Sequence, residues 1–405
     1  MEANAAASLV EPALPASRLV AERPINVLFL TIDIRIGGAE RLVLELVKQM
    51  DRRRFAPAVG WFVDQPAPKE FRELGIPLFP LQKREGFDYR AMRRLAAVVR
   101  EHRIDVINAH HFMSFVYAFH ATRLAQRAGL VYTEHSEDDV RRARGVWRPL
   151  GSLLLRSCDA VVGVSTGVSA ALASYFWLGG QRVSTIDNGV DLTRFGDGGP
   201  GRDEARRRLN LSPGDTVFGQ VANFRRNKNH LFMLRAFRQA FAGRPDVKLV
   251  LIGQGFEGDP ENSEPEVSRF VRDHGLEHVV KVVGYRPDVH ELLRAFDVFG
   301  LVSYKEGLPL SVIEAMASGL PVVATDIDGL RGIVLPGTNG LTVPPDNDEA
   351  LAEALTQLAG DGSLRRRLGD AGRRLAHSKY SFSRCLTETQ NLLAAAAGRR
   401  APGPA

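Results

Sequence analysis

The stretch of residues 303–325 constrains the fold of this chain more than any other part of the sequence. The apolar residues 295–302 before it are typical of a buried strand, residues 310–317 favour a helix that ends at Gly319, and residues 321–325 predict a second strand. Strand, loop, helix and strand in this order form a βαβ unit, which requires a parallel sheet with helices on its faces.

Two carboxylates in this stretch are predicted to lie on different structural elements. Glu306 and Glu314 are eight positions apart, so on one helix they would point ~80° away from each other. We therefore expect Glu306 in the loop and Glu314 on the helix. The backbone N–H groups of residues 308–311 have no partner within the helix, and they lie at the sheet edge where open α/β folds bind anions.

The same stretch resembles the signature of glycosyltransferase family 4, the retaining enzymes with the GT-B fold. The resemblance rests on two Glu that flank seven residues, followed by Ala-Met-Ala and Gly-x-Pro-Val-Val. It implies an α/β fold of two Rossmann-like, doubly wound domains facing each other across a cleft. It also implies that Glu306 faces the donor sugar, that Glu314 binds the ribose, and that the segment between them binds the diphosphate. The residues of that segment are Gly307, Leu308, Pro309, Leu310 and Ser311. Without the resemblance, the two Glu read as an ordinary loop carboxylate and an ordinary helix carboxylate.

Further candidates lie at predicted strand ends in the N-terminal half. A strand over residues 25–32 leads to Gly37 and Gly38 and then to a helix, an arrangement that lets phosphate approach a helix N-terminus. The resemblance implies that Gly38 faces the diphosphate. It also selects His110, after the strand 104–108, as the residue beside the donor sugar, with His111 as the alternative and His135 ranked below. A histidine that is simply hydrogen-bonded at a strand end is the other interpretation.

Cations of the second half are predicted to bind the diphosphate. The resemblance carries over to Lys228, but the family's Arg five residues earlier is Asn223 here, and we expect Arg225 to replace it. A second departure is Gly332, where the family has Glu. The predicted catalytic residues are thus His110, Glu306 and Lys228.

The length of 405 residues predicts two domains. We expect a disordered tail at 1–22, an acceptor domain at 23–195, a linker at 196–214 and a donor domain at 215–380. A helix at 381–397 would cross back to the first domain, leaving a tail at 398–405. Residues 188–191, Asn-Gly-Val-Asp, are assigned a scaffold role as a turn.

The net charge of +6 suits anionic partners. The arginine runs are scattered and few have aromatic residues between them, which disfavours nucleic acid. Residues 141–148, with Val146 and Trp147, are instead a candidate for peripheral contact with an anionic membrane, although solvated arginines and a core Trp are the simpler reading.

Cofactor and metal motifs are missing from the sequence. Its two cysteines have no metal-ligand spacing, and residues 137–139 form an isolated acidic patch. We therefore expect no metal and no cofactor, with a nucleotide diphosphate sugar as co-substrate. No signal peptide or membrane span is recognised, which predicts a cytoplasmic protein that could act at the inner face of the membrane.

The predicted function is transfer of a sugar, with retention, from the nucleotide sugar to a hydroxyl of a glycan or lipid-linked acceptor, in polysaccharide or glycolipid biosynthesis. The alternative is a binding module without turnover, which the departures at Asn223 and Gly332 favour. The nucleotide, the sugar, the acceptor, the linkage and the oligomeric state stay open.

Overall fold

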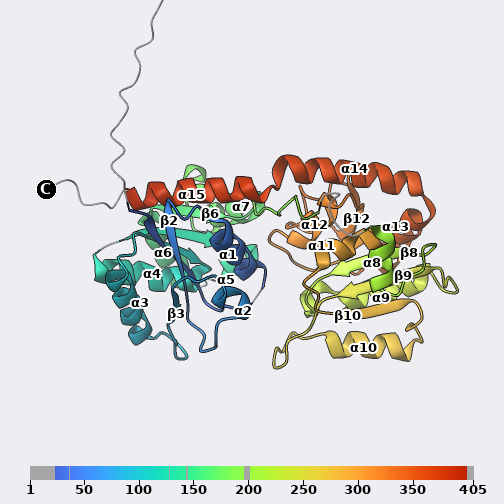
Figure 1. The fold of residues 1–405 in the computed structure, drawn as a ribbon, viewed down its shortest axis with the longest axis horizontal. Helices are drawn as coiled ribbons and strands as arrows, with labels where there is room; N and C mark the ends of the chain where they lie inside the picture. The colour runs from blue at the N-terminus through green and yellow to red at the C-terminus, as the bar shows by residue number, and fades with distance from the viewer. Residues whose placement is uncertain (1–22, 36, 127, 143–144, 196–200, 399–405) are drawn as a thin grey trace, which may run out of the picture.

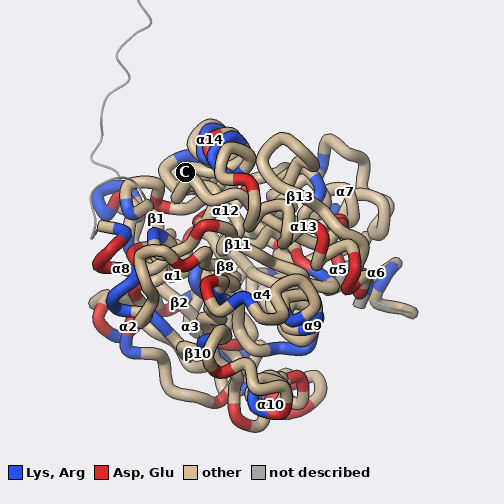
Figure 2. Tube along the Cα trace, turned by 90° about the vertical axis from the view of Figure 1, so that its right-hand side faces the viewer, with Lys and Arg blue, Asp and Glu red and all other residues tan. Residues whose placement is uncertain are grey.

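The computed structural model describes residues 23–35, 37–126, 128–142, 145–195 and 201–398. The tail predicted at 1–22, most of that at 398–405, and linker residues 196–200 lie outside the described residues. Two lobes lie side by side, and the last two helices run along both of them (Figure 1). Basic and acidic residues are interspersed over the elements in the view of Figure 2.

The N-terminal domain is a parallel sheet covered by helices. Its strand order is β3-β2-β1-β4-β5-β6-β7, with β1 (Ile25–Thr31), β2 (Phe55–Trp61), β3 (Leu78–Pro80), β4 (Val106–His110), β5 (Gly129–Glu134), β6 (Ala160–Gly163) and β7 (Val183–Thr185). Its helices are α1 (Gly38–Gln49), α2 (Lys69–Arg72), α3 (Tyr89–Glu101), α4 (Phe112–Ala125), α5 (Glu137–Arg142), α6 (Trp147–Arg156), α7 (Thr166–Tyr175) and the short η1 (Gly180–Arg182). The order reverses between β1 and β4, and such switch points are where open α/β sheets bind ligands.

Burial and capping explain these elements locally. Val27 to Leu30 of β1 are fully buried, as expected for a strand with helices on both faces of its sheet. The Asp88 side chain accepts hydrogen bonds from the N–H groups of Arg90 and Ala91 at the start of α3. Ser165 caps α7 in the same way, so polar residues set these helix starts.

The C-terminal domain repeats the same plan. Its strand order is β10-β9-β8-β11-β12-β13, with β8 (Thr216–Val221), β9 (Val247–Ile252), β10 (Val280–Gly284), β11 (Val298–Leu301), β12 (Val322–Thr325) and β13 (Gly340–Val343). Its helical elements are α8 (Arg202–Arg208), η2 (Arg226–Lys228), α9 (His230–Ala240), α10 (Glu264–Asp273), α11 (Val289–Leu292), η3 (Leu293–Ala295), α12 (Leu310–Ala317), α13 (Asp348–Gly360) and α14 (Gly362–Lys379). Two doubly wound α/β domains confirm the predicted fold class.

The predicted βαβ unit is β11, α12 and β12. The helix has the predicted bounds, and it ends before Gly319, whose φ of +77° is easily adopted only by glycine. The first strand starts at Val298 and not at residue 295, because residues 293–295 form the turn η3.

The last helix, α15 (Phe382–Gly398), packs against β1, β4 and β5 of the N-terminal domain. The Val190 N–H donates to the Tyr380 carbonyl, and the Phe382 N–H donates to the Val190 carbonyl, both at 2.9 Å. A Cβ on Gly189 would lie 2.5 Å from the Ser381 carbonyl oxygen. Residues 188–191 are therefore the place where the C-terminal segment docks, and glycine is needed for that approach. Within the described ranges, no helix is long and apolar enough to cross a membrane.

Candidate functional site

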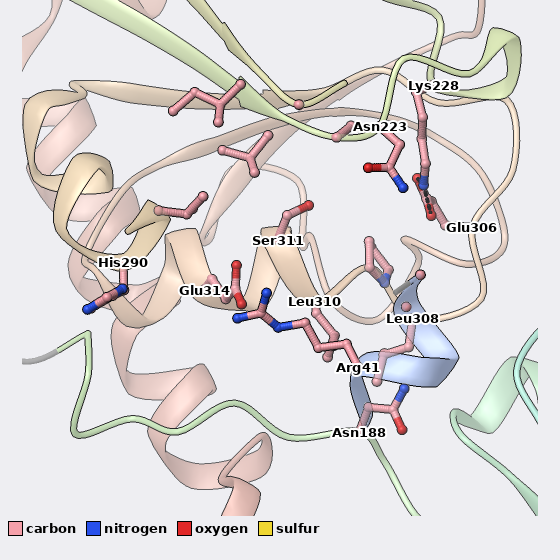
Figure 3. A pocket seen from close by; sticks show the side chains of 18 of the residues that line it. Arg41, Asn188, Asn223, Lys228, His290, Glu306, Leu308, Leu310, Ser311 and Glu314 are labelled. Carbon is pink, nitrogen blue, oxygen red and sulfur yellow. Dashed lines mark hydrogen bonds and ion pairs between the residues drawn. The ribbon is translucent and has the colours of Figure 1, made fainter. Parts of the chain in front are cut away.

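A cleft between the two domains holds a cavity of about 340 Å³. The N-terminal domain and the segment that follows it contribute loop and helix residues, namely Gly37, Gly38, Ala39, Arg41, His135, Asn188, Arg194 and Phe195. The C-terminal domain contributes Asn223, Lys228, Tyr285, Arg286, Pro287, His290 and residues 306–311 with Glu314. The wall of the cleft is thus built at the carboxyl ends of both sheets, and Figure 3 shows four of its charged side chains, Arg41, Lys228, Glu306 and Glu314.

The start of α12 forms one wall of this cavity. The helix begins at Leu310 after Pro309, and no side chain caps it. Within the described residues, the N–H groups of Leu310 and Ser311 have no protein acceptor. A Cβ on Gly307 would lie 1.9 Å from the His135 carbonyl oxygen of the opposite domain. Glycine at 307 therefore lets the two domains meet directly beside a helix start that favours anions.

Glu306 and Lys228 form a close ion pair on this wall (Figure 3). The Lys228 Nζ lies 2.6 Å and 2.7 Å from the two carboxylate oxygens, and the Ser303 hydroxyl donates to Oε1 at 2.6 Å. Only 8% of the Glu306 side chain is exposed. The two residues come from the loops that follow β11 and β8, neighbouring strands of the sheet. The expected loop position of Glu306 is confirmed, and Lys228 stands beside it.

Glu314 lies on α12, as expected, and lines the same cavity. Burial raises the pKa of its carboxyl, while the charges of Arg41 and Arg194 oppose that rise. The Arg41 guanidinium is directed toward α12, near Glu314 and Ser311 (Figure 3). The sequence reasoning passed over both arginines, although Arg41 follows the Gly-Gly-Ala-Glu turn directly.

Arg225 does not line the cavity. Its backbone forms an antiparallel bridge with Asn262, and its guanidinium Nε lies 3.1 Å from an Asp259 oxygen, with 47% of the side chain exposed. Asn223 lines the cavity instead. The bridge turns residue 225 away, so the structure does not bring the expected substitute to the place of the missing arginine.

Three histidines meet at the carboxyl ends of β4 and β5. His110 is fully buried and does not line the cavity; its Nδ1 lies 2.7 Å from Nε2 of His135, which does. Burial and the nearby charge of His111 lower the pKa of His110 to about 3, and burial lowers that of His135 well below its usual value. The structure thus places the lower-ranked His135 at the cavity, with a neutral His110 behind it.

His111 carries the charge of this cluster. Burial alone would lower its pKa, but Glu134, Glu40 and Asp139 raise it to about 9. The His111 Nδ1 lies 3.5 Å from a Glu134 oxygen and 3.7 Å from an Asp139 oxygen. Among the described residues, these three are the only group of such side chains close enough to hold a metal ion. Without a metal ion, the protonated His111 pairs with the two carboxylates as an ion cluster.

We expect His111→Asn to lower the free energy of unfolding more at about pH 7 than at about pH 10. The folded pKa lies above the usual value of 6.5. The stabilisation is therefore complete below that value and lost as pH rises through about 9. It amounts to roughly 3–3.5 kcal/mol when complete and to roughly 2.5 kcal/mol at pH 7. Asn tolerates the φ of +70° at this position. Urea unfolding at both pH values measures the effect, with His377→Asn on the exposed face of α14 as control; equal losses at both pH values would contradict it.

Comparison with known proteins identifies the family. The model described as Glycosyltransferase Family 4 matches residues 36–194, and the model described as Glycosyl transferases group 1 matches residues 201–375. The chain is 29% identical over 324 residues to a D-inositol 3-phosphate glycosyltransferase of Nocardia farcinica, covering 74% of this chain and 71% of that protein. It is 24% identical over 283 residues to the UDP-Gal:alpha-D-GlcNAc-diphosphoundecaprenol alpha-1,3-galactosyltransferase of Escherichia coli, covering 68% of this chain and 72% of that protein.

Solved structures share the fold. The structure of Anabaena HepE in complex with UDP and glucose matches with a TM-score of 0.77 at 24% identity, covering 91% of this chain and 99% of that chain. WaaG, a glycosyltransferase involved in lipopolysaccharide biosynthesis, matches with a TM-score of 0.70 at 17% identity, covering 91% of this chain and 99% of that chain. With matched segments in both domains and two doubly wound sheets across one cleft, the chain belongs to the group 1, family-4-like glycosyltransferases of the GT-B fold.

Proposed function

We propose that this protein is a retaining hexosyltransferase that moves a sugar from a nucleotide diphosphate sugar to a hydroxyl of a glycan or lipid-linked acceptor. The observation that carries the proposal is the single wall on which the free amides of α12, the Lys228–Glu306 pair and Glu314 converge. Amides and cations there would stabilise the charge that develops on the leaving diphosphate. Polysaccharide or glycolipid biosynthesis is the setting that the relatives named above support.

We infer that the donor lies along this wall. The diphosphate would lie against the amides of residues 307–311, with the sugar toward Glu306 and the ribose toward Glu314. The base would lie near Tyr285, whose side chain is half exposed at the cavity. His135 would face the sugar, and His110 would position it through the 2.7 Å contact between their ring nitrogens.

We infer that Arg41 supplies the cation that is missing at Asn223. Among the Lys and Arg side chains that line the cavity, Lys228 is paired with the Glu306 carboxylate and Arg286 with the Asp288 carboxylate, whereas Arg194 contacts only the His290 ring, at 3.3 Å. Within the described residues, the Arg41 side chain makes no hydrogen bond or ion pair. It projects from α1 one turn after Gly37, so phosphate bound at that helix start would lie within its reach. The charge would then come from the opposite domain, and domain closure would complete the site.

The chemistry needs no protein base and no metal in this proposal. The leaving phosphate itself takes the proton of the acceptor hydroxyl while the new bond forms on the same face of the sugar. Lys228, Arg41 and the α12 amides would carry the positive potential for which other enzymes use a divalent cation. Closure around His135 and Gly307 excludes water and limits donor hydrolysis.

A panel of UDP-, GDP- and ADP-sugars tests the function. Slow release of free sugar from one donor, unaffected by a chelator, supports catalysis without metal; mass spectrometry and proton NMR of the product with a lipid-linked acceptor give the sugar and the anomeric configuration. An inverted product would refute retention. Tight donor binding without any turnover would support the alternative, a non-catalytic binding module, which the departures at Asn223 and Gly332 favour.

Glu314→Gln is expected to weaken binding of the free nucleotide diphosphate about tenfold or more. A carboxylate that accepts two ribose hydroxyls forms charge-assisted hydrogen bonds worth ~1.5–3 kcal/mol, and the neutral amide does not. Calorimetry measures the affinity, with Glu353→Gln on the exposed side of α13 as the matched control. Unchanged affinity would remove Glu314 from the ribose role.

A further inference from the structure

A second, much smaller cavity of about 20 Å³ lies inside the N-terminal domain, and we call it the inner cavity. Its walls come from α1, from β4, β5 and β6, from the segment after β7 and from α15. The docking of α15 on the N-terminal sheet therefore covers it. Most of the lining side chains are apolar, but His110 and Asn188 are among them. A cavity of this size has room for one water molecule, which needs about 10–15 Å³.

Two buried polar atoms of these residues have no hydrogen-bond partner among the described residues. They are Nε2 of His110 and Oδ1 of Asn188. His110 is fully buried, and only 4% of Asn188 is exposed. A buried polar atom without a partner carries the full penalty of its removal from water, so native proteins supply such atoms with a protein group or a water molecule. Both residues line the inner cavity, so one water molecule there satisfies both atoms.

His110 connects the inner cavity to the donor cleft through its other ring nitrogen. Its Nδ1 lies 2.7 Å from Nε2 of His135, which lines the cleft. Burial holds the pKa of His110 at about 3 and that of His135 well below its usual value. Both rings are therefore neutral, and each has one N–H group. A single proton lies between the two nitrogens, so the tautomer of one ring sets the tautomer of the other.

Asn188 lies on the boundary between the two cavities. It lines the donor cleft as well as the inner cavity, and Figure 3 shows its side chain among those of the cleft. Its backbone is fixed, because the Asn188 N–H donates to the Val164 carbonyl at 3.3 Å and the next residue, Gly189, packs against the Ser381 carbonyl. The amide oxygen can only accept hydrogen bonds. A water molecule beside it must therefore direct one O–H group toward Oδ1.

We propose that a water molecule in the inner cavity bridges Asn188 Oδ1 and His110 Nε2, and that Asn188 thereby acts as a positioning residue for His135. The bond to Oδ1 orients the water, which then makes one fixed hydrogen bond to His110. That hydrogen bond selects one tautomer of His110, and the 2.7 Å contact imposes the matching tautomer on His135. The Nδ1 atom of His135 then keeps one role, donor or acceptor, toward a hydroxyl of the donor sugar. Only this last step rests on the proposed function.

Two variants remove the water in different ways. Asn188→Leu takes away the amide oxygen, whereas Val162→Ile adds a methyl group to the wall of the inner cavity and leaves Asn188 in place. Val161→Ile is the matched control, because Val161 is as buried as Val162, at 2% exposure, and packs in the core on the opposite face of β6. Proton–nitrogen NMR of protein labelled with ¹⁵N-histidine shows which ring nitrogen of His110 and of His135 carries the proton.

We expect one tautomer of each ring in the wild type and in Val161→Ile, and a mixture of tautomers in Asn188→Leu and Val162→Ile. With the donor that the sugar panel identifies, kcat/KM of these last two variants should fall about threefold to tenfold, the range of one neutral hydrogen bond. A high-resolution crystal structure of the wild type should contain an ordered water within hydrogen-bond distance of both atoms.

Three results would overturn the proposal. The first is a wild-type crystal structure without that water, and the second is a pair of imidazole spectra in Asn188→Leu and Val162→Ile that match the wild type. The third is an equal change in Val161→Ile, which would make the effect one of general repacking. Circular dichroism shows whether each variant folds, and Val162→Ile keeps the test decisive if Asn188→Leu does not. The expected spectra without any sugar transfer would leave the water bridge intact and count only against the proposed function.

Discussion

Lys228→Ala is expected to lower kcat about hundredfold or more while KM changes much less. The Lys228 ammonium already lies 2.6 Å from Glu306 in the cleft, where only 22% of its side chain is exposed. As charge builds on the leaving phosphate, a cation on a flexible stem can move toward it, so the interaction is stronger in the transition state than in the ground state. Steady-state kinetics with the donor that the sugar panel identifies measures the effect.

Two further variants isolate that role. Removal of Lys228 leaves the nearly buried Glu306 with Ser303 as its remaining hydrogen-bond donor, which destabilises the fold as well. Lys228→Ala combined with Glu306→Gln removes the unpaired charge, so it should recover stability in urea unfolding without recovering kcat. Arg226→Ala, two residues away and paired with Glu266 on the surface, is the matched control. A rise in KM alone would show that Lys228 binds ground state and transition state equally.

Arg41→Ala is expected to lower kcat/KM about tenfold to a hundredfold, the value of a charge-assisted contact to phosphate. Adding Asn223→Arg to the Arg41→Ala variant should restore much of the lost activity, because it returns a cation to the cleft wall from the C-terminal domain. In the wild-type background, Asn223→Arg should be neutral or harmful, since the phosphate would already be neutralised. Kinetics of the two single variants and the double variant, read as a double-mutant cycle, measures the coupling.

Arg225→Ala distinguishes this arrangement from the one expected from the sequence. Its guanidinium is held by Asp259 and does not line the cavity, so we expect activity close to that of the wild type. A loss with Arg225→Ala as large as that with Arg41→Ala would restore Arg225 as the substitute. Raised activity in Asn223→Arg, with Arg41→Ala harmless, would instead show that the second cation is absent from this enzyme.

Local sequence patterns predicted the structure correctly where one helix and the residues beside it contain all the information that the prediction needs. The helix Leu310–Ala317 was predicted with its bounds, because its apolar spacing and the following glycine are read within one stretch. The same stretch separated the loop position of Glu306 from the helix position of Glu314. By contrast, the strand Phe55–Trp61 was not predicted, and it contains Pro57, a residue type that is found mainly in edge strands and bulges. At Pro57 the strand is flanked by β1 alone, because β3 pairs only from Val59 onward.

Candidate site residues were predicted less well wherever a second element decides the direction of a side chain. Arg225 has the right charge and nearly the right position, but its bridge to Asn262 turns it to Asp259. His110 is the last residue of β4 and His135 directly follows β5, and the depth of each beneath the cleft depends on the packing of neighbouring elements. Arg41 was not predicted as a site residue, because it lies opposite α12 only when the two domains face each other.

The sequence by itself determined the βαβ unit around residues 303–325 and most of the other strands and helices that were predicted, from apolar periodicity, glycine positions and helix starts, which act over a few residues. The chain length predicted two domains, and the resemblance to family 4 predicted how they face each other and which segment lines the cleft. Only the tertiary structure decided which cation reaches the cleft and which histidine faces it. Each of these depends on contacts between residues far apart in the chain, and no local pattern encodes the distance between them.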